Sequence, residues 1–158
     1  LKESNCPLEW IEFHVAEWKN EGGLEKEAAT CASLAEAAMA NGKTAVVYTS
    51  RTVIDLSDQT PEQLLAISVR ISDALTSVVS RLAKRPRFLI AKGGITSSDV
   101  GTIALAVKKA RVLGQVQPGI PVWKIGEESR FPGMSYIIFP GNVGDEDTLR
   151  KIVEVLNR

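Results

Sequence analysis

The 158-residue chain has the usual length of one domain, and this length lets it bury a hydrophobic core without disulfides or metal ions. Hydrophobic residues make up 44% and charged residues 24%, a composition typical of globular proteins that argues against disordered, fibrous and membrane classes. Lys and Arg total 19, as do Asp and Glu, so no overall positive charge attracts nucleic acid or an anionic membrane. Any phosphate site must therefore be local.

The two cysteines, Cys6 and Cys31, are too few for a disulfide framework and lack zinc-type spacing, so we expect free thiols in a reducing compartment, with Cys31 in the core. No apolar run approaches the roughly 18 to 20 residues of a membrane span, and no N-terminal signal is present. These features predict a cytoplasmic protein. Because Leu1 to Pro7 lead directly into a strand-like run, we expect a fragment of a longer polypeptide.

From the N-terminus, the pattern predicts a strand, a helix and a second strand. Glu9 to Val15 is rich in aromatic and β-branched residues, which favours a strand. After Gly22-Gly23, apolar residues recur at helical spacing as far as Ala38, and Asn41-Gly42 supplies a stop signal. Thr44 to Tyr48 is an apolar run of strand length, typical of a central strand covered on both faces.

A loop from Thr49 to Gln59 precedes a well-marked helix start. Thr60-Pro61-Glu62-Gln63 combines an N-cap residue, a proline at the first helical position and a glutamine at the third. The apolar periodicity continues this helix to about Ala83. Arg87 to Lys92 is the next buried strand, and we expect a helix to begin near Ser97 or Ser98.

The rest of the chain predicts three strands and a closing helix. The strands cover Ala110 to Val116, Pro121 to Ile125 and Tyr136 to Phe139, and the helix runs from about Asp145 to the end. Alternation of strands with helices gives right-handed βαβ units, whereas the strand cluster favours some antiparallel pairing. We therefore predict an α/β fold with a mainly parallel mixed sheet and helices on both faces, Rossmann-like and three-layered, in one domain over residues 1–158.

The segment Gly93-Gly-Ile-Thr-Ser97 lies between a strand and a helix and suits an anion. Glycines let backbone N–H groups approach phosphate oxygens, hydroxyls add donors, and a helix N-terminus carries positive partial charge. The structural alternative is a tight turn at Gly93-Gly94, a cap at Ser97 or Ser98, and Asp99 complementing the helix dipole. The position favours a ligand, because ligands of open α/β sheets bind beyond the carboxyl ends of the strands.

A second glycine loop, Pro140-Gly-Asn-Val-Gly144, also follows a strand and precedes a helix. Two such loops at strand ends could enclose one nucleotide. Taken alone, this loop is equally consistent with turn residues at Gly141 and Gly144 and an N-cap at Asp145.

Other motifs carry less weight. The chain has no G-x-G-x-x-G motif, and Gly42-Lys43-Thr44 precedes a strand where a P-loop would follow one, so we interpret it as a helix C-cap. The only histidine, His14, lies in a predicted strand, which favours a structural role. Two acidic pairs are open to a metal role, although helix caps and solvated surface explain them as well: Asp55 with Asp58, and Asp145 with Asp147.

Four blocks, taken in order, resemble the C-terminal nucleotide-binding domain of the four-carbon acid sugar kinases, in a subset with Gly-Gly-Ile-Thr-Ser. The blocks cover nearly the whole chain past Gly42: Val46 to Ser50, Ile90 to Ser97, Gly114 to Pro121, and Phe139 to Gly144. Members of this family generally have an acidic residue where this chain has Ile95, and commonly a lysine where it has Phe139.

The resemblance implies an ATP-binding domain of a kinase that phosphorylates a hydroxyl of a small sugar acid such as threonate or erythronate, with Mg²⁺ accompanying the nucleotide. It implies the following cofactor-binding residues: Gly93, Gly94, Ile95, Thr96, Ser97, Gly141, Asn142 and Gly144. The implied partner is an N-terminal substrate domain of the same polypeptide. That domain would hold the acid and the general base, so no catalytic residue is assigned here and the fragment alone is expected to be inactive.

The departures at Ile95 and Phe139 keep a second hypothesis in view. In it, the chain is a non-catalytic nucleotide-binding or scaffolding module of a larger metabolic protein. The identity of the acid and the oligomeric state, a homo-oligomer included, stay open.

Overall fold

The structure, a computed structural model, describes residues 1–51 and 58–158, which form two compact units. One unit is Leu8–Leu82, and the other combines Leu1–Pro7 with Ala83–Arg158. Asp55, considered above as a metal ligand, lies outside the described residues. No described helix is both long and apolar enough to cross a membrane.

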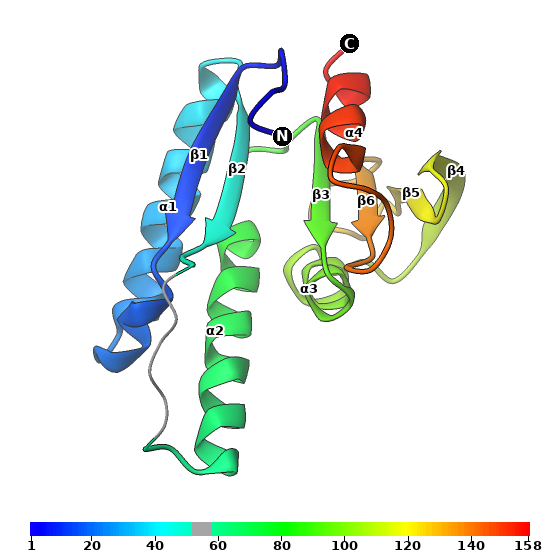
Figure 1. The fold of residues 1–158 in the computed structure, drawn as a ribbon. Helices are drawn as coiled ribbons and strands as arrows, with labels where there is room; N and C mark the ends of the chain where they lie inside the picture. Colours follow the sequence, from blue (N-terminus) through cyan, green and yellow to red (C-terminus); the bar gives the residue numbers. More distant parts are fainter. Residues whose placement is uncertain (52–57) are drawn as a thin grey trace. The chain divides into compact units, whose positions relative to one another are not determined.

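The first unit is built on a βαβ element. Strands β1 (Leu8–Phe13) and β2 (Thr44–Thr49) pair in parallel, from Leu8 opposite Thr44 to Phe13 opposite Thr49. Between them run a short 3-10 helix, η1 (Val15–Lys19), and helix α1 (Gly23–Ala40), as Figure 1 shows. The predicted strand-helix-strand order is confirmed. The first strand ends at Phe13 rather than Val15, because the chain turns into η1 after His14.

Helix α1 packs a face of small residues against this pair of strands. Ile11 and Phe13 are buried on β1, and Ala28, Cys31 and Ala35 are buried on α1. The Cys31 thiol donates a weak hydrogen bond to the Glu12 carbonyl at 3.6 Å, and burial raises the pKa of this thiol to about 11. The prediction that Cys31 belongs to the core is therefore confirmed.

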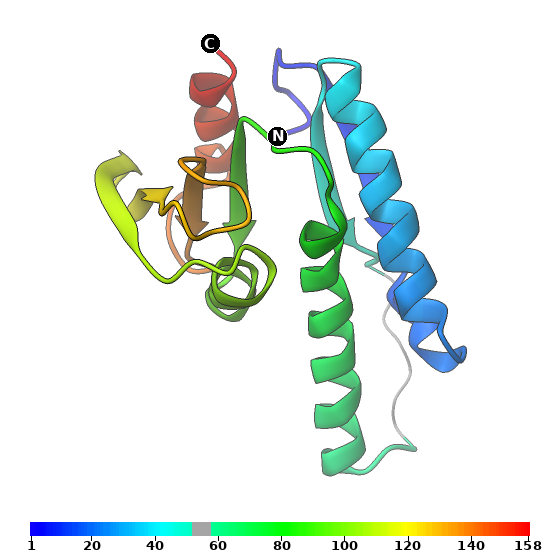
Figure 2. The same ribbon diagram turned by 180° about the vertical axis from the view of Figure 1, so that it is seen from behind.

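Helix α2 (Pro61–Arg81) begins at the predicted cap. The Thr60 hydroxyl accepts a hydrogen bond from the Gln63 N–H at 3.3 Å, and the Thr60 N–H donates to the Gln63 side chain at 2.8 Å. These reciprocal bonds satisfy two backbone N–H groups at the N-terminus of the helix, so the sequence signature of a capping box is confirmed. Figure 2 shows α2 as a long, straight helix.

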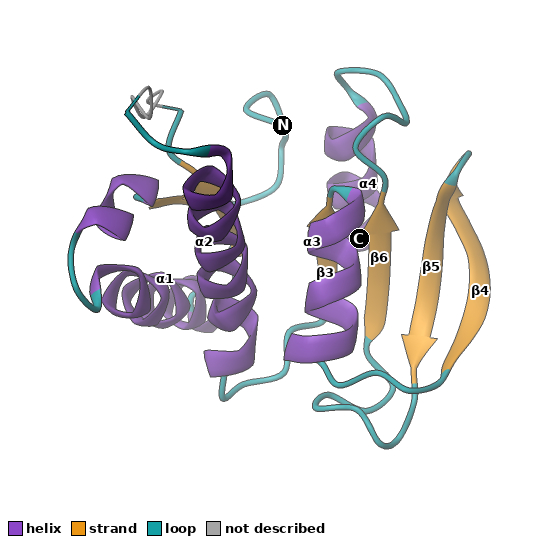
Figure 3. Cartoon of the chain, turned by 90° about the horizontal axis from the view of Figure 1, so that it is seen from below, coloured by secondary structure: helices purple, strands orange, loops and turns teal. Residues whose placement is uncertain are grey.

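The second unit contains a four-stranded mixed sheet. Its strands are β3 (Phe88–Lys92), β4 (Ala110–Gln117), β5 (Ile120–Ile125) and β6 (Ser135–Phe139), in the spatial order β3-β6-β5-β4. Strands β3 and β6 are parallel, whereas β5 is antiparallel to both β6 and β4 (Figure 3). The predicted antiparallel pairing in the last part of the chain is confirmed.

Helices cover both faces of this sheet. On one face, Ile152 of α4 (Thr148–Leu156) packs in a buried cluster with Ile137 and Phe139 of β6. On the other face, Tyr136 contacts the helical segment formed by α3 (Gly94–Asp99) and the π-helical η2 (Val100–Ala104), where an added Cβ at Gly101 would lie 3.2 Å from the Tyr136 ring. The predicted α/β class with a mixed sheet is confirmed. The described strands form two sheets rather than one, and the four-stranded sheet has one parallel and two antiparallel pairings where the sequence predicted mainly parallel ones.

Two helix starts differ from the sequence predictions. Helix α3 begins at Gly94, ahead of the expected Ser97 or Ser98, because Gly93 takes the N-cap position with φ of 108°. Helix α4 begins at Thr148 rather than near Asp145, because Asp145 to Asp147 form a separate turn closed by the Thr148 N–H on the Asp145 carbonyl at 3.2 Å. Both differences change which residues belong to the loops between strand and helix.

Candidate functional site

The two glycine loops lie side by side at the carboxyl ends of β3 and β6. The Gly93 N–H donates a hydrogen bond to the Phe139 carbonyl at 2.8 Å. A Cβ added at Gly141 would lie 3.8 Å from the Gly93 Cα. Because β3 and β6 are parallel neighbours, with Lys92 opposite Phe139, both strands deliver their loops to the same edge of the sheet (Figure 1). The sequence predicted this meeting only from the general placement of ligands in α/β folds.

The first loop exposes backbone donors at the start of α3. The first bond of this helix runs from the Ser97 N–H to the Gly93 carbonyl at 2.9 Å, so the N–H groups of Gly94, Ile95 and Thr96 have no acceptor within the helix. A Cβ at Gly94 would meet nothing within 4 Å, which leaves open space over the loop. These donors can therefore approach an anionic ligand closely.

Ser97 connects α3 to two strands rather than capping the helix. Its hydroxyl is buried and donates to the Ala91 carbonyl at 2.7 Å, while its carbonyl accepts a bond from the Tyr136 hydroxyl at 2.6 Å. The structural alternative in which Ser97 or Ser98 caps the helix is wrong, because the N-cap residue is Gly93, which makes no side-chain bond. Ser97 instead anchors the first turn of α3 to β3 and β6.

Ile95 projects from the first loop with 74% of its surface exposed. An apolar side chain of this size at an exposed turn gains nothing from burial within the described fold. Thr96, the next residue, is partly buried and offers the remaining hydroxyl of this loop.

The second loop is held in place by a turn that requires glycine. Gly144 has φ of 85°, and a Cβ there would lie 2.6 Å from the Thr148 hydroxyl oxygen. That hydroxyl donates to the Asp145 carboxylate at 2.7 Å, and this bond, reinforced by Lys151, lowers the pKa of Asp145. Gly141 and Asn142 are exposed at the tip of the loop. The acidic pair Asp145 and Asp147 thus organises the start of α4.

A third block of the sequence reaches the same loop. The turn between β4 and β5 places Gly119, with φ of 77°, where an added Cβ would lie 3.1 Å from Val143. The Gly119 N–H donates to the Gln115 side chain at 2.8 Å, which fixes this turn. Three of the four blocks named above therefore meet around the second glycine loop.

Lys92 is a candidate binding residue that the sequence reasoning did not single out. Its ammonium group lies 5.2 Å from the centroid of the Phe139 ring, and its side chain is exposed. A cation held over an aromatic face is attracted by the ring quadrupole. Lys92 is the last residue of β3 and directly precedes Gly93. Its position before a glycine loop is the sequence feature that could have indicated a binding role.

His14 forms an ion pair with a neighbouring carboxylate. The His14 Nδ1 lies 2.6 Å from Glu27 Oε1, and the same oxygen accepts the His14 N–H at 2.8 Å. This carboxylate raises the pKa of His14, in agreement with the structural role expected from the sequence. Over residues 1–51 and 58–158, no group of three or more His, Cys, Asp or Glu side chains is placed to hold a metal ion.

The chain belongs to the family of nucleotide-binding C-terminal domains, whose model matches residues 2–149. This match runs across both compact units. Comparison with curated proteins gave no match.

Solved structures show the same fold. A protein of unknown function from Bordetella bronchiseptica, crystallised with bound citrate as a domain-swapped dimer, matches 97% of this chain with a TM-score of 0.66 and 15% identity. A Haemophilus influenzae protein matches 96% with a TM-score of 0.60 and 24% identity. A Salmonella typhimurium protein, provisionally described as a tRNA synthase, matches 95% with a TM-score of 0.63 and 19% identity. The chain spans 34–35% of the length of these three proteins.

Proposed function

We propose that this nucleotide-binding domain serves a kinase, and that it binds ATP for transfer of a phosphoryl group to a hydroxyl of a small sugar acid such as threonate or erythronate. The observation that carries the proposal is the hydrogen bond from Gly93 to Phe139, which brings two glycine loops to one edge of the sheet. The family match supports nucleotide binding, and the four blocks of resemblance support the sugar acid.

In this proposal the triphosphate lies across the two loops. The N–H groups of Gly94, Ile95 and Thr96 bind phosphate oxygens, and Lys92 supplies a positive charge next to them. Ser97 keeps α3 in position, while Gly141, Asn142 and Gly144 close on the nucleotide from the second loop. Mg²⁺ would enter with the nucleotide, coordinated mainly by its phosphates.

The reaction itself needs residues outside this chain. Phosphoryl transfer depends mainly on positioning and charge stabilisation, and well-oriented placement can supply about 7 to 11 kcal/mol of the barrier. An N-terminal substrate domain would hold the acid and the general base. The citrate bound to the Bordetella protein supports an acid ligand for the longer polypeptide.

Isothermal titration of the chain with ATP and ADP tests the nucleotide site. Gly94→Val places a side chain in the open space above the loop and should weaken binding by about tenfold or more, because it blocks close approach to the backbone donors. Ser98→Val, one turn away on an exposed position of α3, is the matched control and should bind normally. Unchanged affinity in a folded Gly94→Val variant would refute the assignment.

A coupled ADP-release assay tests whether catalysis needs a second domain. With D-threonate and D-erythronate, the chain alone should give no acid-dependent turnover, and addition of the separately expressed upstream domain should restore it. Turnover by the chain alone would contradict the need for a second domain.

The exposed Ile95 favours the second candidate, a nucleotide-binding module without catalysis. In that case the full-length protein would bind ATP and need this domain for assembly, yet show no turnover with any four-carbon acid. Acid-dependent turnover by the full-length protein would exclude this candidate.

A further inference from the structure

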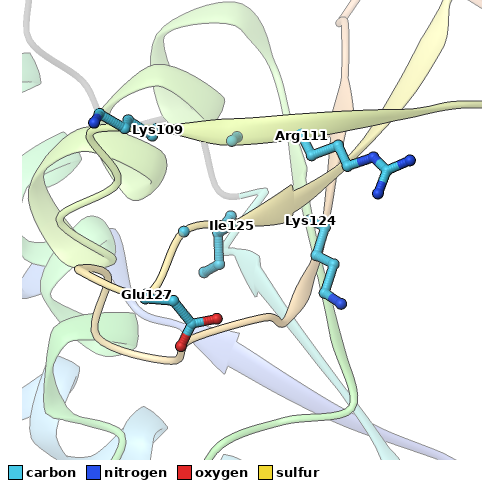
Figure 4. Close-up of a pocket in the computed structure, with 7 residues that line it drawn as sticks. Lys109, Arg111, Lys124, Ile125 and Glu127 are labelled. Carbon is cyan, nitrogen blue, oxygen red and sulfur yellow. The ribbon is translucent and has the colours of Figure 1, made fainter.

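The second unit has a pocket away from the glycine loops, with a mainly apolar surface and cationic side chains around it. It is open and shallow, with a volume of about 330 Å³, and lies where β4 begins and β5 ends. Its charged lining residues are Lys109, Arg111, Lys124 and Glu127, and the buried Ile125 contributes to its apolar part (Figure 4). Three cationic side chains against one carboxylate give the pocket an excess of positive charge.

The pairing of β4 with β5 places two of these cations directly against each other. Arg111 is opposite Lys124 in the antiparallel register, so both side chains project from the same face. Like charges directly opposite each other destabilise a sheet. None of the ion pairs among the described residues includes Arg111 or Lys124, whereas Lys109 interacts electrostatically with Glu128.

The carboxylate of the neighbouring Glu128 accepts hydrogen bonds from the backbone. Its Oε1 accepts the N–H groups of Lys108 at 3.0 Å and Lys109 at 2.7 Å, which lowers the pKa of Glu128 and fixes the chain as it enters β4. A Cβ added at Gly126 would force this carboxylate to shift, so glycine at this position leaves room for it. The site is thus shaped by the backbone, and its cations are left to face solvent.

This pocket is separate from the proposed nucleotide site. Lys124 is opposite Ser135, the first residue of β6, whereas the glycine loop follows Phe139, the last. A strand of this length extends over roughly 15 Å, so one phosphate group cannot contact both. We propose that the cross-strand pair Arg111 and Lys124, at one end of this pocket, binds the phosphate group of a small molecule.

The chemistry of the lining residues defines this ligand. The Arg111 guanidinium offers a planar fork that matches phosphate oxygens, and the Lys124 ammonium group adds charge that a multiply charged anion neutralises. The Lys109 side chain points away from both (Figure 4). Glu127 adds an acceptor for hydroxyl groups at the same pocket. A phosphate ester of a small polyol therefore fits better than inorganic phosphate.

A nitrogen-15 NMR titration with inorganic phosphate, and separately with glycerol 3-phosphate, tests the proposal at constant ionic strength. Saturable shifts are expected at the amides of Arg111, Lys124 and Gly126. Arg111→Gln combined with Lys124→Gln should weaken binding by about tenfold or more, whereas Arg85→Gln, an exposed cation in the same unit, should not. The double variant should melt at an unchanged or higher temperature, because it removes a like-charge pair.

The outcomes distinguish a phosphate ester, the free ion and the absence of a specific site. Tighter binding of glycerol 3-phosphate assigns the site to a phosphate ester, and equal or tighter binding of inorganic phosphate assigns it to the free ion. Shifts spread over exposed lysines without saturation, or equal binding by the folded double variant, would overturn the proposal. Because ATP binding at the glycine loops is followed at Gly93 and Gly94, failure of either site is seen independently.

Discussion

The hydroxyl of Tyr136 donates a hydrogen bond of 2.6 Å to the Ser97 carbonyl, and this bond ties β6 to the first turn of the helix that follows β3. The Tyr136 side chain is fully buried, and burial raises the pKa of its hydroxyl. The hydroxyl therefore stays protonated, and the bond persists, through the neutral range.

Tyr136→Phe should lower the free energy of unfolding by about 1 to 2 kcal/mol, because a buried bond is lost and the ring packing is kept. Urea denaturation measures this loss. Tyr48→Phe is the matched control, since its hydroxyl makes only an exposed 3.5 Å bond to Glu12 and should cost little. Equal effects of the two substitutions would contradict the anchoring role of Tyr136.

Gly144→Ala should be more destabilising than Gly42→Ala. Both glycines have positive φ, 85° and 70°, which costs a non-glycine residue about 1 to 2 kcal/mol. At Gly144 the added Cβ also meets Thr148, whereas at Gly42 nothing lies within 4 Å. The difference between the two variants in thermal or urea unfolding therefore isolates the collision, and equal losses would show that the Gly144 turn yields easily.

The pair formed by His14 and Glu27 predicts a specific pH dependence. The bond to Glu27 raises the pKa of His14 above 6.5, so the stability that it contributes is complete below pH 6.5 and disappears as the pH rises through the raised value. As His14 is the only histidine, one imidazole resonance in a proton NMR titration gives its pKa directly. Glu27→Gln should shift this pKa down toward 6.5, while Glu25→Gln, exposed on the same helix, should not.

Lys92→Met should weaken ATP binding while the chain remains folded. The substitution keeps a long side chain over Phe139 but removes the charge next to both glycine loops, and the cation–π contact itself contributes only about 0.5 to 1 kcal/mol at an exposed position. Titration calorimetry should show a loss that decreases at high salt. Lys2→Met, also exposed in this unit, serves as the control, and equal affinity in the two variants would remove Lys92 from the site.

Features set by local chemistry could be predicted from the sequence. The capping box at Thr60 and Gln63 depends on residues three positions apart, and the structure confirms it. The three late strands were also recognised, because β-branched and aromatic residues separated by glycine and proline leave few alternatives.

Features that depend on contacts between distant segments could not be predicted from the sequence alone. Ser97 follows two glycines and resembles a helix cap, yet the register of β3 with β6 turns its hydroxyl toward Ala91 and brings Tyr136 onto its carbonyl. The place of Lys92 over Phe139 likewise depends on the pairing of β3 with β6, two strands that are far apart in the sequence. The prediction of a single domain stays a prediction, and the structure describes two compact units.

The burial of Cys31 gives the protein two thiols of unequal reactivity. Alkylating reagents attack the thiolate, and at neutral pH the raised pKa of Cys31 leaves very little of it, whereas Cys6 is only half-buried and lies on the other unit. Iodoacetamide should therefore modify Cys6 first and reach Cys31 only when α1 moves away from β1. The rate of that slower modification measures how often the Leu8–Leu82 unit opens, independently of the rest of the chain.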